Sequence, residues 1–160
     1  MEDFTRVIFQ NAITREKLAH NMYLEMDNNS DNEKIRDLFY KLAEEELLHE
    51  KLFSRLDPDV VKVVNENPLK NLSLLKSVKQ EEITAPETKE ELNKALDFAI
   101  SEEQKAYEEY NLLLTHLDFG ESRDALKEIA VQELKHRTML QKVKLEINDN
   151  DWSNIKIPDN

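Results

Sequence analysis

The sequence predicts an all-α fold, a four-helix bundle made of two repeated helical hairpins that are joined by a long crossover. The chain of 160 residues contains only one glycine and four prolines, and its periodic segments are filled with Ala, Leu, Glu and Lys, the residues that lose least on entering a helix. Apolar side chains recur at intervals of three and four residues, as on one face of a helix. Similar residues also recur 87 positions apart, as Glu16 and Glu103 or Glu46 and Glu133 do, which indicates that one hairpin occurs twice.

The first predicted hairpin begins with a helix over residues 3–27, which stops in the polar cluster Asn28-Asn29-Ser30. Ser30 and Glu33 form a Ser-x-x-Glu capping box, in which both side chains accept hydrogen bonds from free amides at a helix start. We therefore expect the second helix to open at Ser30. It should last until Asp57-Pro58, because proline cannot continue a helix.

The second predicted hairpin repeats this plan. Thr88 and Glu91 form the same capping box and open a third helix, which fades near Leu117. The single glycine, Gly120, marks the turn into a fourth helix, which ends around Asn148.

A connector over about residues 58–87 joins the hairpins, and a tail over residues 149–160 follows the predicted domain of residues 1–148. A connector of this length is unusual in a compact domain, so we expect it to run along the bundle with one or two short helical pieces. The tail is expected to be irregular. The apolar residues available to dock these segments are Val60, Val61, Val63, Val64, Leu69, Leu72, Leu74 and Leu75 in the connector and Trp152, Ile155 and Ile157 in the tail.

The composition excludes several classes of function. Asp and Glu number 34 against 22 Lys and Arg, so the formal net charge is -12, and nucleic acid or an anionic membrane surface would be repelled. The absence of cysteine excludes disulfides, thiolate zinc sites and iron–sulfur clusters. The first residues lack the basic and apolar regions of a signal peptide, and no run of about 18 apolar residues occurs. We expect a cytoplasmic protein that binds neither nucleic acid nor a membrane.

Each of the four apolar stripes is interrupted near its middle by ionisable residues. The first and third helices each carry a lone glutamate there, and the second and fourth each carry a Glu-x-x-His pair, whose members face the same way. An unpaired buried carboxylate costs several kcal/mol or takes up a proton, so these groups require cations between them. The candidate metal ligands are Glu16, Glu46, His49, Glu103, Glu133 and His136.

Helix geometry places these six residues at one level. In each hairpin the lone glutamate and the Glu-x-x-His pair are equally distant from the turn, roughly 24 Å away at about 1.5 Å per residue. Each Glu-x-x-His pair is expected to hold one metal, with the lone glutamates bridging two. This ligand set is the pattern of di-iron and di-manganese bundles. Oxygen and imidazole ligands without thiolate favour two iron or manganese ions, although zinc also binds such ligands.

The motifs Glu16-x-x-Ala19-x-x-x-Tyr23 and Leu42-Ala43-Glu44-Glu45-Glu46-x-x-His49, with their second-half counterparts, resemble those of the rubrerythrin branch of the ferritin-like superfamily. The resemblance covers the four helices and implies a ferritin-like bundle with a di-iron centre and redox chemistry with oxygen or peroxide. Rubrerythrins also carry a rubredoxin domain with a four-cysteine iron, so this cysteine-free chain is expected to receive electrons from a separate protein. They place a further glutamate one turn after the third-helix ligand, where this sequence has Ala106, which bears on peroxidase activity.

Several ionisable residues near the candidate ligands have two interpretations. His20, one turn after Glu16, could be a further ligand or a residue that supports one. Tyr23 and Tyr110 could donate hydrogen bonds to the metal-bridging carboxylates or be core aromatics whose hydroxyls have other partners. His116 lies near a helix end, where a role toward the helix dipole or solvent is expected. Four glutamates are expected to be solvated: Glu44, Glu45, Glu50 and Glu102.

Three functions are compatible with these patterns. The leading hypothesis is an oxidoreductase of peroxidase or ferroxidase type, in which two ferrous ions react with oxygen or hydrogen peroxide. The alternative is a ferritin-like iron-binding protein that handles iron without turnover. A third is a metal-free helical interaction module whose buried carboxylates are protonated. The sequence is also compatible with a homodimer and with an external redox partner.

Overall fold

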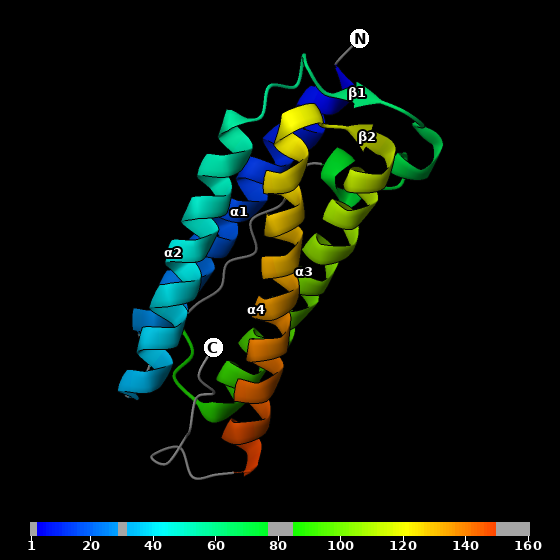
Figure 1. Ribbon diagram of the computed structural model, residues 1–160. Helices are drawn as coiled ribbons and strands as arrows, with labels where there is room; N and C mark the ends of the chain where they lie inside the picture. Colours follow the sequence, from blue (N-terminus) through cyan, green and yellow to red (C-terminus); the bar gives the residue numbers. More distant parts are fainter. Residues whose placement is uncertain (1–2, 29–31, 77–84, 150–160) are drawn as a thin grey trace.

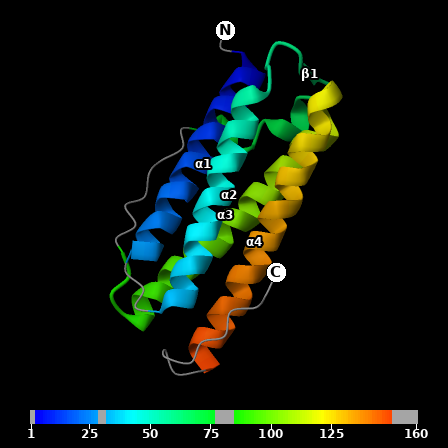
Figure 2. The same ribbon diagram turned by 60° about the vertical axis from the view of Figure 1, so that its left-hand side comes forward.

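Within residues 3–28, 32–76 and 85–149, which the computed structural model describes, four long helices form two antiparallel hairpins that lie side by side (Figure 1). The first hairpin packs α1 (Phe4–Asn28) against α2 (Glu33–Arg55). The second packs α3 (Lys89–His116) against α4 (Arg123–Asp149). Figure 2 shows the same arrangement after a turn of 60°. The predicted all-α bundle of two hairpins is confirmed.

The start of α2 differs from the prediction. Asn32 is the N-cap, and its side-chain oxygen accepts hydrogen bonds from the amides of Lys34 at 3.0 Å and Ile35 at 3.3 Å. The predicted opening of this helix at Ser30 is therefore wrong, although Ser30 itself lies outside the described residues. Asparagine caps a helix as well as serine does, and from position 32 its short side chain reaches two of the free amides of the first turn.

The predicted cap of α3 is confirmed. The Thr88 hydroxyl accepts a hydrogen bond from the amide of Glu91 at 3.1 Å. The Glu91 carboxylate accepts from the amide of Glu87 at 2.8 Å, one residue before the position that an ideal capping box uses. At the other end of the hairpin, Gly120 has a φ of 52° and opens the 3₁₀ turn η3 (Gly120–Ser122), from which α4 continues. A positive φ is a conformation that glycine adopts without strain.

Thr88→Ala is expected to lower the free energy of unfolding by about 1 kcal/mol, because the amide of Glu91 loses its acceptor at a helix start. Urea unfolding followed by circular dichroism would measure this change. Thr115→Ala is the matched control, since it removes the same atoms from an exposed position in the last turn of α3. An equal loss in both variants would contradict a specific role for the cap.

The crossover contains two short helical pieces, as predicted, and a pair of strands that the sequence did not predict. The helical pieces are η1 (Asn67–Leu69) and η2 (Ser73–Leu75), and the strand β1 (Lys62–Val63) pairs antiparallel with β2 (Leu117–Asp118). The predicted apolar patch is only partly buried, since Val60 and Val64 are 65% and 72% exposed. Within the described part of the crossover, the buried core includes Val61, Leu69, Leu72 and Leu74. The predicted docking residues of the tail, Trp152, Ile155 and Ile157, lie outside the described residues.

A buried ionic contact fixes the crossover to the bundle. Arg15 on α1 and Glu109 on α3 pair at 3.2 Å, and their side chains are only 10% and 11% exposed. Ser73, the first residue of η2, donates its backbone amide and its hydroxyl to the Glu109 carboxylate. Burial of this kind is tolerated because each charge has both a counter-charge and hydrogen bonds. The crossover is thereby held against both hairpins at once.

The apolar core is divided into two clusters that occupy opposite ends of the bundle. The cluster at the end with β1 and β2 includes Phe9, Phe53, Leu69, Leu113, Phe119 and Leu126. The cluster at the other end includes Met26, Phe39, Leu96, Leu140, Val143 and Ile147. Because each helix buries only one stripe, none of the helices in the described ranges is apolar and long enough to cross a lipid bilayer. Between the two clusters lies a layer of buried polar side chains.

Candidate metal centre

All six predicted ligands belong to this buried polar layer. None is more than 4% exposed, although four are glutamates and two are histidines. Each comes from the middle of a long helix, where i to i+3 spacing directs the Glu46–His49 and Glu133–His136 pairs inward from α2 and α4. The structure therefore brings together all six of the candidate metal ligands.

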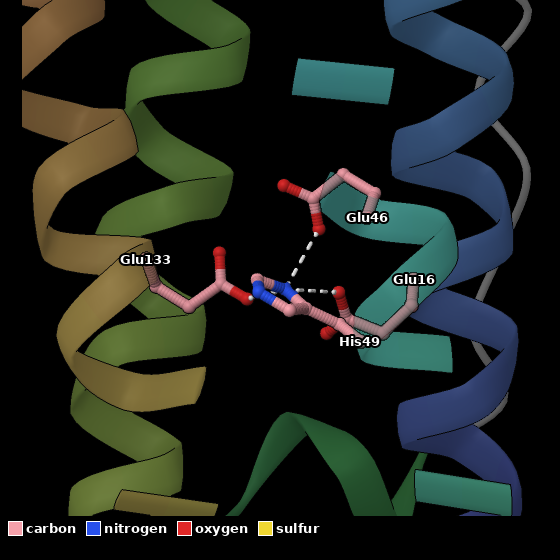
Figure 3. Close-up of side chains that lie close together, drawn as sticks. All are labelled: Glu16, Glu46, His49 and Glu133. Carbon is pink, nitrogen blue, oxygen red and sulfur yellow. Dashed lines mark ion pairs between the residues drawn. The ribbon is translucent and has the colours of Figure 1, made fainter. Parts of the chain in front are cut away.

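The first group of side chains surrounds the Nδ1 atom of His49 (Figure 3). This nitrogen lies 2.9 Å from Glu133 Oε1 and 3.3 Å from both Glu16 Oε2 and Glu46 Oε2. The carboxylates come from three helices, α1, α2 and α4. Four potential ligand atoms thus converge within 4.8 Å of one another.

The second group surrounds the Nδ1 atom of His136. This nitrogen lies 2.8 Å from Glu46 Oε1 and 3.7 Å from both Glu103 Oε2 and Glu133 Oε2. These four side chains also offer ligand atoms within 4.8 Å of one another. The two imidazole rings stack with centroids 5.7 Å apart, so the two groups are direct neighbours.

The two groups share Glu46 and Glu133, whereas Glu16 and Glu103 each belong to one group only. The expectation that the lone glutamates bridge is therefore wrong for this geometry. The two shared carboxylates come from the helices that also carry the histidines, and each of them lies close to the Nδ1 atoms of both rings. Glu46 and Glu133 would therefore be available to both of two cations held here, and Glu16 and Glu103 to one each.

Tyrosine hydroxyls explain why each lone glutamate serves only one group. Tyr110 donates to Glu16 Oε1 and Tyr23 donates to Glu103 Oε1, in both cases from the opposite hairpin. One oxygen of each lone glutamate is thus occupied, and the other faces a histidine. Burial, followed by the charge of the adjacent glutamate, raises the pKa of both tyrosines well above its ordinary value, so each hydroxyl keeps its proton and remains a donor. The hydroxyls therefore bind the lone glutamates, while both rings also belong to the apolar core.

The outer nitrogen of each histidine has an acceptor that the sequence analysis missed or misjudged. His136 Nε2 lies 2.7 Å from Glu45 Oε2, and His49 Nε2 lies 2.6 Å from Gln132 Oε1. Both acceptors are oxygens that cannot donate, so each Nε2 carries the proton and each Nδ1 is directed toward the carboxylates. The expectation that Glu45 is solvated is wrong in this respect. The repeat offset of 87 residues relates Glu45 to Gln132, but it does not indicate that each reaches a histidine of the other hairpin.

The remaining candidates lie away from the two groups. His20 Nδ1 hydrogen-bonds to the carbonyl of Ala43 at 2.7 Å, and within the described residues it belongs to neither group. His116 contacts the carbonyl of Leu112 in the last turn of α3. Glu44 is exposed, as expected, and Glu102 is partly exposed and pairs with Lys105. Glu50 was also expected to be solvated, but its side chain is only 19% exposed and pairs with Lys17.

The layer carries an electrostatic conflict in the absence of a cation. Burial raises the pKa of Glu16 to about 7, and the charge of Glu46 adds to this. Burial also raises the pKa of Glu103 to about 8, with a further contribution from Glu133. For His49 and His136 burial acts to lower the pKa, but the facing carboxylates outweigh it and raise both values well above the ordinary range. Without a cation, bound protons therefore supply part of the positive charge that balances the buried carboxylates.

The inward-facing oxygen and nitrogen atoms of the layer are placed to bind a metal rather than to form hydrogen bonds with one another. In the part of the chain that the structure describes, Glu46 Oε1, His49 Nδ1, Glu133 Oε1 and His136 Nδ1 are buried without a hydrogen-bond partner. They come within ion-pair distance of one another, yet the contacts lack hydrogen-bond geometry. Buried polar atoms are almost always satisfied in folded proteins. Carboxylate oxygens and imidazole nitrogens without sulfur form the donor set that iron and manganese prefer.

A comparison with known protein families finds a match over most of the chain. The family model described as Rubrerythrin matches residues 8–144, which include parts of all four helices and all six candidate ligands. No curated protein and no solved structure matches the chain.

Proposed function

The chain belongs to the rubrerythrin family, and from this premise we propose that it is a di-iron carboxylate oxidoreductase that reduces oxygen or hydrogen peroxide with electrons from a separate donor. The observation that supports the proposal most directly is the pair of buried Glu and His groups with two glutamates in common. A single shared pair of carboxylates keeps two cations close enough to act on one small molecule.

Each candidate ligand has a defined role in this proposal. Glu16 and His49 would hold one ion, Glu103 and His136 would hold the other, and Glu46 and Glu133 would be available to both. Two ferrous ions supply the two electrons that, with two protons, convert one molecule of hydrogen peroxide into two molecules of water. Four carboxylates balance the four positive charges of two ferrous ions while both imidazoles stay neutral. The buried layer is therefore electrically neutral when it is loaded.

The surrounding side chains position the ligands and exclude water. Tyr23 and Tyr110 fix the orientation of the lone glutamates, so that one oxygen of each remains free for a cation. The two apolar clusters close the layer from both ends of the bundle. In such a water-poor site, electrostatic interactions between ligands and cations are stronger than in bulk water.

The proposal is tested by stopped-flow oxidation of protein loaded anaerobically with ferrous ion. Hydrogen peroxide or oxygen should oxidise the bound iron at least about tenfold faster than free ferrous ion under the same conditions. Glu44→Gln, which removes an exposed carboxylate from α2 without touching either group, should oxidise its iron at the wild-type rate. Oxidation no faster than that of free ferrous ion would refute the proposed chemistry.

A second candidate, iron handling without turnover, is favoured by one observation. Ala106 is buried one turn after Glu103 and offers no ligand atom. Rapid oxidation by oxygen that stops after one turnover, even with an artificial electron donor present, would support this alternative. Repeated reduction of peroxide under the same conditions would support the oxidoreductase.

A further inference from the structure

The two hairpins differ at the residue that supports each histidine. Glu45 and Gln132 occupy the same position of the repeat, directly before the glutamate of each Glu-x-x-His pair. Each reaches across to the other hairpin, so Glu45 on α2 accepts from His136 and Gln132 on α4 accepts from His49. One histidine is thus supported by a carboxylate, and the other by a neutral amide.

The other contacts of the two histidines are closely matched. Both rings are buried, and each Nδ1 faces three carboxylates that include the shared Glu46 and Glu133. Each group also contains one lone glutamate that accepts from a tyrosine hydroxyl. The carboxylate of Glu45 against the amide of Gln132 is therefore the main chemical difference between the two positions.

We propose that Glu45 makes the two metal positions unequal, so that a divalent cation occupies the position at His136 before the position at His49. This inference rests on the proposed metal centre. A carboxylate that accepts from Nε2–H increases the electron density at Nδ1 and stabilises positive charge on the metal-bound ring. The amide of Gln132 orients its ring equally well but contributes no charge. Glu45 acts through His136 and is a positioning residue.

A second difference between the hairpins acts in the same direction. Arg15, which directly precedes Glu16, corresponds in the repeat to Glu102, which directly precedes Glu103. In the sequence, a cation thus directly precedes the lone glutamate of the His49 position, and an anion directly precedes that of the His136 position. Each of these charges is paired, Arg15 with Glu109 and Glu102 with Lys105. Their contribution is correspondingly smaller than that of Glu45.

The size of the effect is limited by solvent. The Glu45 side chain is 35% exposed, so its charge is partly screened. Replacement of a residue that supports a metal ligand commonly changes metal affinity by about 10- to 100-fold. For this exposed carboxylate we expect about tenfold, the lower end of that range.

The order of filling can be measured with zinc, which is diamagnetic and binds the same ligands. Protein with ¹⁵N-labelled histidine is titrated with Zn²⁺, and imidazole nitrogen shifts report which ring is bound. The first equivalent should shift Nδ1 of His136 and the second that of His49, with affinities about tenfold apart in a competition titration. If the wild-type protein fills both positions at once, or fills the position at His49 first, this result by itself would overturn the inference.

Exchange variants test whether Glu45 is the cause. Glu45→Gln should weaken the first site about tenfold, and Gln132→Glu should strengthen the second by a similar factor, so that each variant fills both positions together. The double variant Glu45→Gln/Gln132→Glu should fill His49 first. Glu44→Gln and Val131→Glu make the same charge changes at exposed positions of the same helices. An effect of these controls equal to that of the exchange variants would assign the preference to net charge and overturn the role of Glu45.

This experiment is independent of the redox chemistry. Ordered zinc binding in a protein whose ferrous form does not react would uphold the inference and refute the proposed function. Zinc sites of equal affinity in a protein that rapidly reduces peroxide would refute the inference and uphold the proposed function.

Discussion

Replacing Glu46 by alanine should remove both metal ions from the protein, whereas replacing Glu16 should remove only one. Glu46 offers one oxygen to the group around His49 and the other to the group around His136, but Glu16 faces His49 alone. After anaerobic loading with ferrous ion and desalting, we expect about two irons per wild-type chain, about one in Glu16→Ala and close to none in Glu46→Ala. Metal analysis with simultaneous protein quantification would measure these values.

The repeat supplies a second pair of variants for this prediction. Glu133→Ala should behave like Glu46→Ala, and Glu103→Ala like Glu16→Ala, because each pair occupies equivalent positions 87 residues apart. Glu44→Ala controls for the loss of a carboxylate from an exposed position on α2. Complete metal loss in Glu16→Ala with retention in Glu46→Ala would restore the view that the lone glutamates bridge. Helix content by circular dichroism separates metal loss from unfolding.

The identity of the six ligand candidates could be predicted from sequence because a helix has a fixed period. Positions such as Glu46 and His49 fall on a stripe that is otherwise apolar, and the equal distances from the hairpin turns bring the four stripes together at the same level. The period of the helix and the distances from the turns follow from the sequence without knowledge of any tertiary contact. The gathering of the six side chains in one buried layer followed from them.

The division of labour among the glutamates could not be predicted in this way. It depends on Tyr23 and Tyr110, each of which occupies one oxygen of a lone glutamate from the opposite hairpin. The support of the histidines by Glu45 and Gln132 likewise crosses between hairpins. Periodicity within one helix says which face a residue occupies, but it does not say which side chain of another hairpin that residue meets.

The same distinction applies to the fold. The Thr88 cap is a local interaction over three residues and was predicted correctly. The pairing of β1 with β2 joins segments more than fifty residues apart, and each strand has only two residues, too few for a periodic pattern. Tertiary contacts of the crossover, including the burial of Val61 and Leu69, hold these strands together.

Stability of the metal-free protein should decrease as the pH rises from about 5 to about 9. A glutamate titrates near 4.5 in the unfolded chain, whereas burial raises the pKa of Glu16 to about 7 and that of Glu103 to about 8 in the folded protein. Between these limits the folded state binds more protons than the unfolded state, so unfolding becomes easier with rising pH. The raised pKa values of His49 and His136 act in the same direction, because stabilisation by their protonation is complete below about 6.5 and is lost at higher pH.

Below this window the sign reverses. The hydrogen bond from His136 lowers the pKa of Glu45, and contacts with both histidines lower that of Glu46 although burial opposes the shift. Their contribution to stability is present above about 4.5 and is lost as the pH falls further. The metal-free protein should therefore be most stable near pH 5 and lose about 3 kcal/mol or more by pH 9.

Metal binding should abolish this loss, because cations replace the protons that the buried carboxylates otherwise require. Urea unfolding at pH 5, 7 and 9, with a chelator and with Mn²⁺, would compare the two forms. In the metal-free form Glu16→Gln/Glu103→Gln should flatten the decrease, since an amide keeps the shape of a protonated carboxyl and cannot ionise. A metal-free protein whose stability is constant or increases over this range would show that Glu16 and Glu103 ionise as solvated side chains do. The carboxylates would then need no cation, and the physical reason for placing metal ions in this layer would be lost.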